Sequence, residues 1–280
     1  MSSKLSLEEK IEIVNSAEEF ASYVSKKWPQ VNENGEINYS FVGSLAVLLL
    51  TPAKSIQPIN SAFNETKEIP ARVREKLYSF TRPIGDMDYL PSSDYLKLPL
   101  SQRLGKGGGG PSIAELPENA KKALVLPENM CKFMCDPVDN YGSNEIVKII
   151  GNKNSYLIQS PKNMFGYKIL NSTQSFHMKP EKFKKDFNIL HSAFSEICSL
   201  NDLLDSSYRV LSGYEKAISQ NYGPKVRGMV NQLYAHDEFN GKLKGFFDDL
   251  RKFEIDNNFG ELVQPLVGDI TQTNLKVGFL

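Results

Sequence analysis

The first part of the chain alternates between helical and β-type patterns of apolar residues. From about Leu7 to Lys27, apolar side chains recur every three or four positions, which is typical of an amphipathic helix. Ser6 and Glu9 have the spacing of a capping box at its start. A short β-prone run, residues 37–42, then leads into an apolar helix that Pro52 ends. This pattern predicts a long helix, a strand and a buried helix, in that order.

The stretch that follows is more polar. Residues 53–69 are predicted to form a loop, and residues 71–80 a short helix that begins after a proline. The helix carries a basic cluster of Arg72, Arg74 and Lys76. We interpret the cluster as an ordinary solvated face, with contact to a nucleotide or to an RNA phosphate as the alternative.

A glycine-rich stretch follows, at 107–110. It lacks the spacing of known phosphate-binding loops, so it predicts a flexible loop. Arg103 and Lys106 flank it, and its place in the chain would allow it to close over a bound nucleotide.

The pattern then changes from strands to helices. Three short β-type runs, 145–150, 155–160 and 165–170, are separated by turn residues and predict an antiparallel meander. Beyond them, apolar residues recur at helical spacing. The predicted fold class is therefore α+β: a mixed sheet with flanking helices in a domain at 1–178, followed by a C-terminal helical bundle at 179–280.

Two aspartates stand out against these patterns. If Arg82 to Leu90 contains a strand, Asp86 and Asp88 emerge on one face, while Met87 and Tyr89 face the other way. Mg²⁺ prefers oxygen ligands and is commonly held by one or two carboxylates together with substrate phosphates. The pair therefore predicts a magnesium site for phosphoryl-group chemistry rather than a zinc site.

Gly43 and Ser44 stand at the start of the apolar helix. A glycine at this position lets the backbone approach a phosphate, and the helix start aims N–H groups and a positive dipole end at the anion. The Ser44 hydroxyl would be a further donor. The alternative is that Ser44 merely caps the helix.

The order of these pieces resembles a known family. An apolar run closing on Gly43 and Ser44, followed by Asp86-x-Asp88, is similar to the signature of the nucleotidyltransferase superfamily, which has the polymerase-β-like fold. Arg82, four residues before Asp86, resembles the AbiEii-type abortive-infection toxin branch. Against that branch, residues 53–81 would be an insertion. The competing interpretation is a surface strand with two solvated aspartates after a buried helix.

The resemblance also implies a third carboxylate and a lysine from a later strand. Lys168 matches the lysine, although leucine and asparagine follow where an acid is expected. Glu145 is the other candidate for the carboxylate. Lys184-Lys185-Asp186 is similar to the segment that begins the helical part of AbiEii-like proteins. A missing third acid would leave nucleotide binding intact and put transfer in doubt.

Composition narrows the picture only slightly. Lys and Arg together number 33, as do Asp and Glu, so the net charge does not demand nucleic acid or an anionic membrane as partner. The three cysteines lack zinc-ligand spacing and predict reduced, buried thiols in a cytoplasmic protein. No signal peptide or membrane-spanning run is predicted. The three histidines, at 177, 191 and 236, have no metal or triad spacing.

The resemblance implies transfer of a nucleoside monophosphate from an NTP to a hydroxyl on RNA, protein or a small molecule. Asp86 and Asp88 would hold Mg²⁺ (or Mn²⁺), while Gly43 and Ser44 would seat the triphosphate. Lys168 or Arg82 would offset charge in the transition state, so Asp86, Asp88 and Lys168 are the candidate catalytic residues. An antitoxin-like partner is also implied. The alternative is a non-catalytic nucleotide-binding or toxin-like regulatory module of the same fold.

Overall fold

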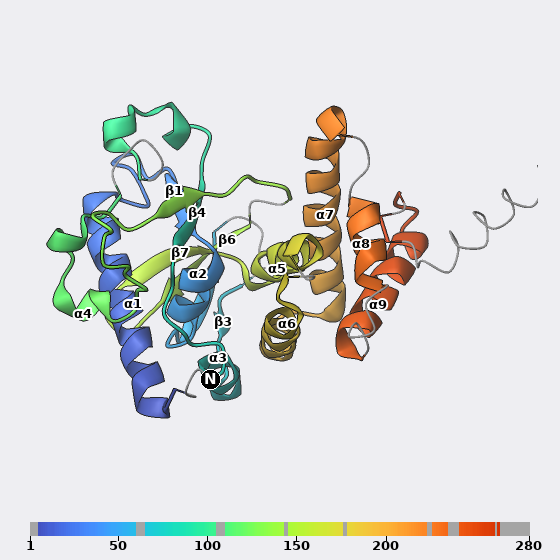
Figure 1. Ribbon diagram of the computed structural model, residues 1–280, viewed down its shortest axis with the longest axis horizontal. Coiled ribbons are helices and arrows are strands. Elements are labelled where there is room, and N and C mark those ends of the chain that lie inside the picture. The colour runs from blue at the N-terminus through green and yellow to red at the C-terminus, as the bar shows by residue number, and fades with distance from the viewer. Residues whose placement is uncertain are drawn as a thin grey trace, which may run out of the picture. The chain divides into compact units, whose positions relative to one another are not determined.

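The computed structural model of the chain describes residues 5–59, 65–104, 110–142, 145–175, 178–222, 226–234, 241–260 and 262–263. It divides into two compact units: unit 1 contains 1–140 and 144–160, and unit 2 contains 141–143 and 161–280 (Figure 1). Most of the glycine-rich loop, His177 and His236 lie outside the described residues.

Unit 1 combines helices with one mixed sheet. Its helices are α1 (Leu7–Lys27), α2 (Gly43–Leu50), α3 (Ala71–Tyr78) and the short α4 (Glu118–Lys121). Its strands are β1 (Tyr39–Phe41), β2 (Ser55–Pro58), β3 (Lys67–Glu68), β4 (Met87–Pro91), β5 (Cys135–Pro137), β6 (Ile146–Ile150) and β7 (Ser155–Gln159). The α+β class is thus confirmed for the described part of the chain.

The strand order in the sheet is β3-β2-β6-β7-β1-β4-β5. β1 pairs with β4 in antiparallel orientation and with β7 in parallel orientation, and β4 pairs with β5 in parallel orientation. The remaining pairs are antiparallel. The β6–β7 hairpin therefore occupies the middle of the sheet, with β2 and β3 on one side and β1, β4 and β5 on the other.

The two faces of the sheet differ in character. Register places one set of fully buried side chains together, and we call this side the aromatic face: Tyr39, Phe41, Met87, Tyr89, Cys135, Val147, Tyr156 and Ile158. The opposite side, which we call the mixed face, carries Asp88, Asp136, Lys148, Leu157 and Gln159. Because neighbouring residues alternate between faces, each strand supplies both.

Helix α1 covers the aromatic face (Figure 1). Tyr156 Oη donates to Glu18 O at 2.9 Å, and Tyr39 Oη donates to Trp28 O at 2.7 Å, so both buried hydroxyls are satisfied by α1 or its C-cap. The predicted capping box at Ser6 and Glu9 is present. The charged side chains of Asp88, Asp136 and Lys148 lie on the opposite, mixed face.

Two predictions of local structure are wrong. The polar segment 53–69 contains β2 and β3, which extend the sheet beyond β6. Residues 165–170 do not form a strand but lie in α5 (Pro161–Ser175). A short apolar run fits either a buried helix or a strand, and Pro161 favours a helix because proline is well suited to the first turn.

Unit 2 is helical in its described residues. Besides α5 it contains α6 (Pro180–Phe194), α7 (Leu200–Tyr222), α8 (Val226–Tyr234) and α9 (Lys242–Asp256). Phe165 and Phe246 meet edge to face, with ring centroids 5.2 Å apart, and join α5 to α9. Unit 2 begins its helical run at residue 161, so it takes in the segment to 178 that the sequence pattern assigns to the sheet domain.

Candidate functional site

Helix α2 is buried over almost its whole length. Residues 45–50 are each at most 3 % exposed, as expected for a helix that is apolar on every side. Gly43 is exposed and Ser44 half-buried, so the first turn alone reaches the surface. Val42 is the N-cap and provides no side-chain hydrogen bond. The first N–H groups of α2 are thus presented without a side-chain cap, and Ser44 is not the cap.

Gly43 lies against Asp88. Its φ of +64° belongs to the left-handed region, which favours glycine. A Cβ atom placed on Gly43 would lie 2.7 Å from Asp88 Oδ2, closer than a carbon and an oxygen can approach. Next to this glycine, the Val42 N–H donates to Asp88 O at 3.1 Å. The structure therefore brings together two residues that the sequence predicts for one site.

The two aspartates alternate with core residues as predicted. Met87 and Tyr89 are 0 % and 2 % exposed on the aromatic face. Asp88 is half-buried in β4, and Asp86 is exposed in the bend directly before this strand. Asp88 lies on the mixed face, and the charge of Asp86 acts on it, so the two carboxylates are close together.

A third aspartate, which the sequence analysis missed, lies beside this pair. Asp136 on β5 is the direct register partner of Asp88 on β4. Asp136 is half-buried and follows Cys135, which is buried on the aromatic face. The sequence holds no alternation that would have identified this strand, because Phe133, Met134 and Cys135 are all apolar and their alternating burial belongs to the folded chain.

The three carboxylates form a region of uncompensated negative charge. Burial, together with the negative charges of Asp86 and Asp136, raises the pKa of Asp88 from 3.8 to about 6. Burial also raises the pKa of the neighbouring Cys135 thiol, with additional contributions from Asp136 and Asp88. Within the described ranges, none of the three aspartates has a cationic side chain as an ion-pair partner.

Glu145, the earlier candidate for the third carboxylate, is elsewhere in the sheet. It directly precedes β6, and Ser160 Oγ donates to Glu145 Oε2 at 3.4 Å. β7 and β1 stand between β6 and β4. Three strand spacings amount to roughly 14 Å, which is too far for Glu145 and Asp88 to share a metal ion. The proposal of Glu145 as the third acid is therefore wrong.

Arg82 precedes β4 in the loop after α3. Its guanidinium carbon lies 4.5 Å from the centre of the Phe80 ring, a cation–π arrangement that holds the side chain in place. Arg82 and Asp86 both lie in the loop between α3 and β4, as expected from the sequence. Its contact with a nucleotide stays a prediction.

Lys168 is on a helix rather than on the predicted strand. Its Nζ lies 2.7 Å from Asp186 Oδ2, and the two side chains are 15 % and 1 % exposed. The Lys168 ammonium also lies 4.9 Å from the centre of the Phe183 ring. These contacts lie within unit 2, so Lys168 has a structural role there, and its catalytic role stays a prediction.

The aspartates could hold a divalent cation only if waters or phosphate oxygens supplied its remaining ligands. In the part of the chain that the structure describes, no three His, Cys, Asp or Glu side chains are arranged as a complete metal site. Mg²⁺ does not need one, because it keeps several waters and takes phosphate oxygens as ligands. Asp88, beside the start of α2, and exposed Asp86 are the residues that would hold it.

The cysteines agree only partly with their prediction. All three are free, and Cys135 and Cys198 are buried, but Cys131 is exposed. The described residue His191 is packed among phenylalanine rings, stacked on Phe187 with centroids 5.4 Å apart. Burial lowers the pKa of His191, so it is a neutral packing residue at pH 7.

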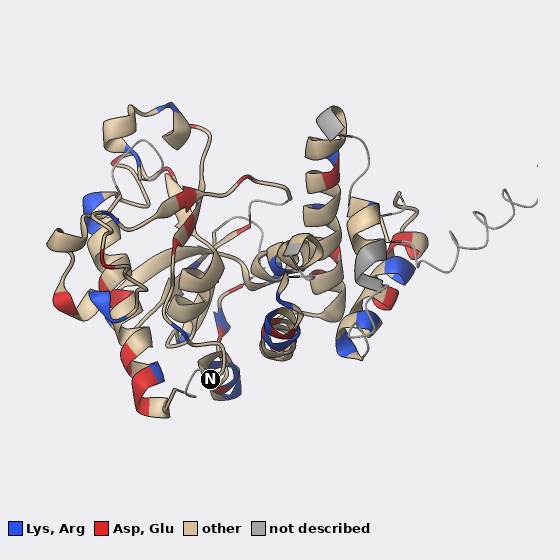
Figure 2. Cartoon of the chain, viewed as in Figure 1, with Lys and Arg blue, Asp and Glu red and all other residues tan. Residues whose placement is uncertain are grey.

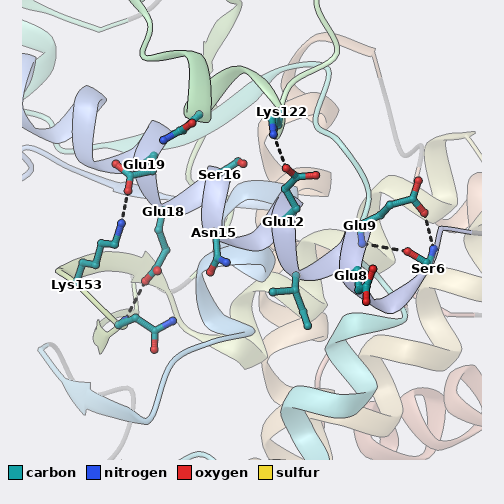
Figure 3. Close-up of a pocket in the computed structure, with 13 residues that line it drawn as sticks. Ser6, Glu8, Glu9, Glu12, Asn15, Ser16, Glu18, Glu19, Lys122 and Lys153 are labelled. Atoms are coloured by element: carbon teal, nitrogen blue, oxygen red, sulfur yellow. Dashed lines mark hydrogen bonds and ion pairs between the residues drawn. The ribbon is translucent and has the colours of Figure 1, made fainter.

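A cavity of about 710 Å³ lies along α1 and is separate from the three aspartates (Figure 3). Its glutamates are largely engaged: Glu12 pairs with Lys122, Glu19 pairs with Lys153, and Glu18 accepts from the Asn152 N–H at 3.0 Å. Figure 2 shows that both signs of charge occur on the elements of unit 1. We interpret this groove as a structural contact of α1 with its neighbours.

No described helix has both the length and the apolar character needed to cross a membrane. Comparisons of the chain with protein-family models, with curated proteins and with solved structures find no match.

Proposed function

We propose that this chain is a nucleotidyltransferase that uses Mg²⁺ or Mn²⁺ to move a nucleoside monophosphate from an NTP to a hydroxyl acceptor. One observation carries the proposal. Asp88 lies between Asp136, its partner in the sheet, and Gly43, where an uncapped helix begins. Carboxylates for a cation and free N–H groups for a phosphate are thus side by side.

Each part of this arrangement has a task in phosphoryl transfer. The first turn of α2 would bind the triphosphate through its N–H groups, with the Ser44 hydroxyl as an additional donor. Asp86 and Asp88 would hold the cation, which supplies neutralisation of the phosphate charge when bound. Positioning and charge neutralisation are the main sources of catalysis in reactions of this kind.

The acceptor hydroxyl would attack the α-phosphorus of the NTP. A bond forms between the acceptor oxygen and this phosphorus, and the bond from phosphorus to the pyrophosphate oxygen breaks. Asp136 is placed to accept the hydroxyl proton, because it is adjacent to Asp88 in the sheet. Its presence favours an active enzyme over the binding-only alternative, which depended on a missing third acid.

The finer assignments depend on the resemblance alone. These are the polymerase-β-like fold, the AbiEii-type branch and an antitoxin-like partner. An RNA or protein acceptor belongs with them. Arg82, in the loop before Asp86, is the nearest basic residue in sequence that could offset charge on the phosphates.

The test is calorimetry of the full chain with Mg²⁺ and each NTP, followed by assay of pyrophosphate release with RNA and protein acceptors. We expect the cation and the nucleotide to bind together, and Asp86→Asn with Asp88→Asn to abolish joint binding. Glu128→Gln, a change at an exposed loop position, is the matched control. Undiminished binding in the double variant would refute the site. Binding without pyrophosphate release would favour the regulatory module.

A further inference from the structure

A second cavity, of about 410 Å³, lies in unit 1 beside β6, β7 and the loop that follows α1. Lys148 of β6 and Leu157 of β7 form its floor, and these two residues are direct register partners. Val31 and Ile37 come from the loop between α1 and β1, and Ile59 follows β2. The volume is within the usual range for small-molecule sites.

The loop that walls this cavity is fixed to the sheet. Gln30 Nε2 donates to Leu157 O at 2.7 Å, and the Leu157 N–H donates to Gln30 Oε1 at 2.9 Å. Gln30 thus replaces a neighbouring strand at this point. Val31 and Ile37 form an isolated antiparallel bridge that closes the loop. The cavity is therefore preformed, which lowers the entropy that a ligand must lose on binding.

Its lining combines apolar side chains with a single charge. Val31 is 40 % exposed and Ile59 45 % exposed at the rim, although both are apolar. Among the described residues that line the cavity, Lys148 is the only charged one, and it has no ion pair with any described acidic side chain. Ser25 of α1 also lines the cavity, but its Oγ is buried beside the Tyr39 hydroxyl and does not face the open space.

We propose that this cavity is a binding site for a small organic anion with an apolar body, such as an aliphatic or aromatic carboxylate. The apolar part would cover Val31, Ile37 and Ile59, and the anionic group would pair with Lys148. The contact between the anionic group and Lys148 would be charge-assisted, and it would set the orientation of the ligand. This site uses none of the residues of the proposed nucleotidyltransferase site, so the two proposals stand or fall separately.

The experiment is calorimetric titration of the full chain with octanoate, and with octanamide as the uncharged analogue. We expect octanoate to bind more tightly than octanamide. Lys148→Gln is expected to weaken octanoate binding about tenfold, because a charge-assisted contact is lost, and to leave octanamide binding unchanged. Ile59→Asp should weaken both, and octanoate more strongly, through lost apolar contact and charge repulsion.

Two variants serve as matched controls. Lys54→Gln removes an exposed lysine of unit 1 outside the cavity, and Leu100→Asp changes an exposed apolar residue of unit 1 that does not line it. Both should bind octanoate like the unchanged chain. The proposal is overturned if octanoate shows no saturable binding in the millimolar range, or if Lys148→Gln and Lys54→Gln bind it equally well.

Discussion

Asp136 and Asp88 are direct partners in the parallel pair of β5 and β4. This relationship places a third carboxylate where the sequence analysis expected one and assigned it elsewhere. We predict that Asp136→Asn lowers the rate of nucleotidyl transfer about 10²–10⁴-fold, the usual contribution of a general base, while nucleotide binding persists. Glu145→Gln is the control and should affect neither. Pyrophosphate release and calorimetry measure the two effects, and equal loss of transfer in both variants would remove Asp136 from the mechanism.

The buried carboxylate of Asp88 predicts a specific pH dependence of stability. Because its pKa in the folded protein is raised to about 6, the folded state holds this proton more tightly than the unfolded chain. The resulting penalty is absent below the unfolded value of 3.8, grows as pH rises to about 6, and is constant above. Asp88→Asn should therefore stabilise the protein by about 1–2 kcal/mol at pH 7.5, since partial exposure reduces the full penalty.

Urea denaturation of Asp88→Asn at pH 4.5 and pH 7.5 checks this expectation. The gain in the free energy of unfolding should be larger at the higher pH. Glu128→Gln should show no such difference. Binding of Mg²⁺ with an NTP should weaken below about pH 6 in the unchanged chain, because the cation requires the ionised carboxylate. A pH-independent gain would mean that Asp88 is not under electrostatic stress.

Gly43 tolerates no side chain. Gly43→Ala would place a Cβ 2.7 Å from Asp88 Oδ2 and force a non-glycine residue to a φ of +64°. We expect a loss of about 1–3 kcal/mol in stability, together with weaker nucleotide binding, because the start of α2 must shift. Gly85→Ala is the control: it precedes Asp86, has no positive φ, and has open space around it. Thermal melts with and without Mg²⁺ and NTP distinguish the two variants.

Ser44 and Ser6 begin their helices in different ways. Ser6 is the N-cap of α1, and its Oγ accepts a hydrogen bond from the Glu9 N–H. In α2 the N-cap is Val42, and Ser44 is the second residue of the helix. Ser6→Ala should therefore cost about 1 kcal/mol of stability and leave the NTP-induced shift in melting temperature unchanged. Ser44→Ala should show the opposite behaviour, with little loss of stability and a smaller shift. An unchanged shift in Ser44→Ala would make this serine a bystander.

The buried Lys168–Asp186 pair predicts a structural effect that can be separated from a catalytic one. Lys168→Met removes the ammonium group that lies 2.7 Å from the buried Asp186 carboxylate, so we expect a loss of about 3–5 kcal/mol in stability. The double variant Lys168→Met with Asp186→Leu should recover most of the lost stability. Lys244→Met, which breaks an exposed pair with Asp248, should change stability little. If the double variant folds but cannot transfer, Lys168 also acts on the phosphates. Normal transfer would limit it to structure.

Local signals in the sequence were sufficient for the parts of the fold that local interactions determine. The capping box of α1, the buried apolar helix after Gly43 and the alternation around Asp88 all follow from neighbouring residues, and all are confirmed. They also identified most of the candidate site in unit 1. Only Asp136 was missed there, because β5 is three residues long and its role depends on pairing with a distant strand.

The wrong predictions share a cause in long-range contacts. β3 contains only Lys67 and Glu68, and nothing in these polar residues indicates a strand until β2 pairs with them. In α5, Phe165 and Ile169 face the interior of unit 2, and this spacing suits a helix as well as a strand. The choice is made by the rest of the unit: Ser206 Oγ of α7 donates to Asn163 Oδ1 at 2.7 Å.

The strand order has a consequence for folding. β1, β4 and β5 can pair as soon as they are synthesised, and so can β2 and β3, but no strand of one group pairs with a strand of the other. The β6–β7 hairpin, last of the strands in the chain, joins them from the middle. A nascent chain that ends before residue 145 therefore carries two separate sheet fragments, each with an open edge that can pair wrongly. The β6–β7 hairpin, which joins the two groups of strands, is the last strand pair to be synthesised. The complete sheet of unit 1 therefore cannot form until this hairpin is present.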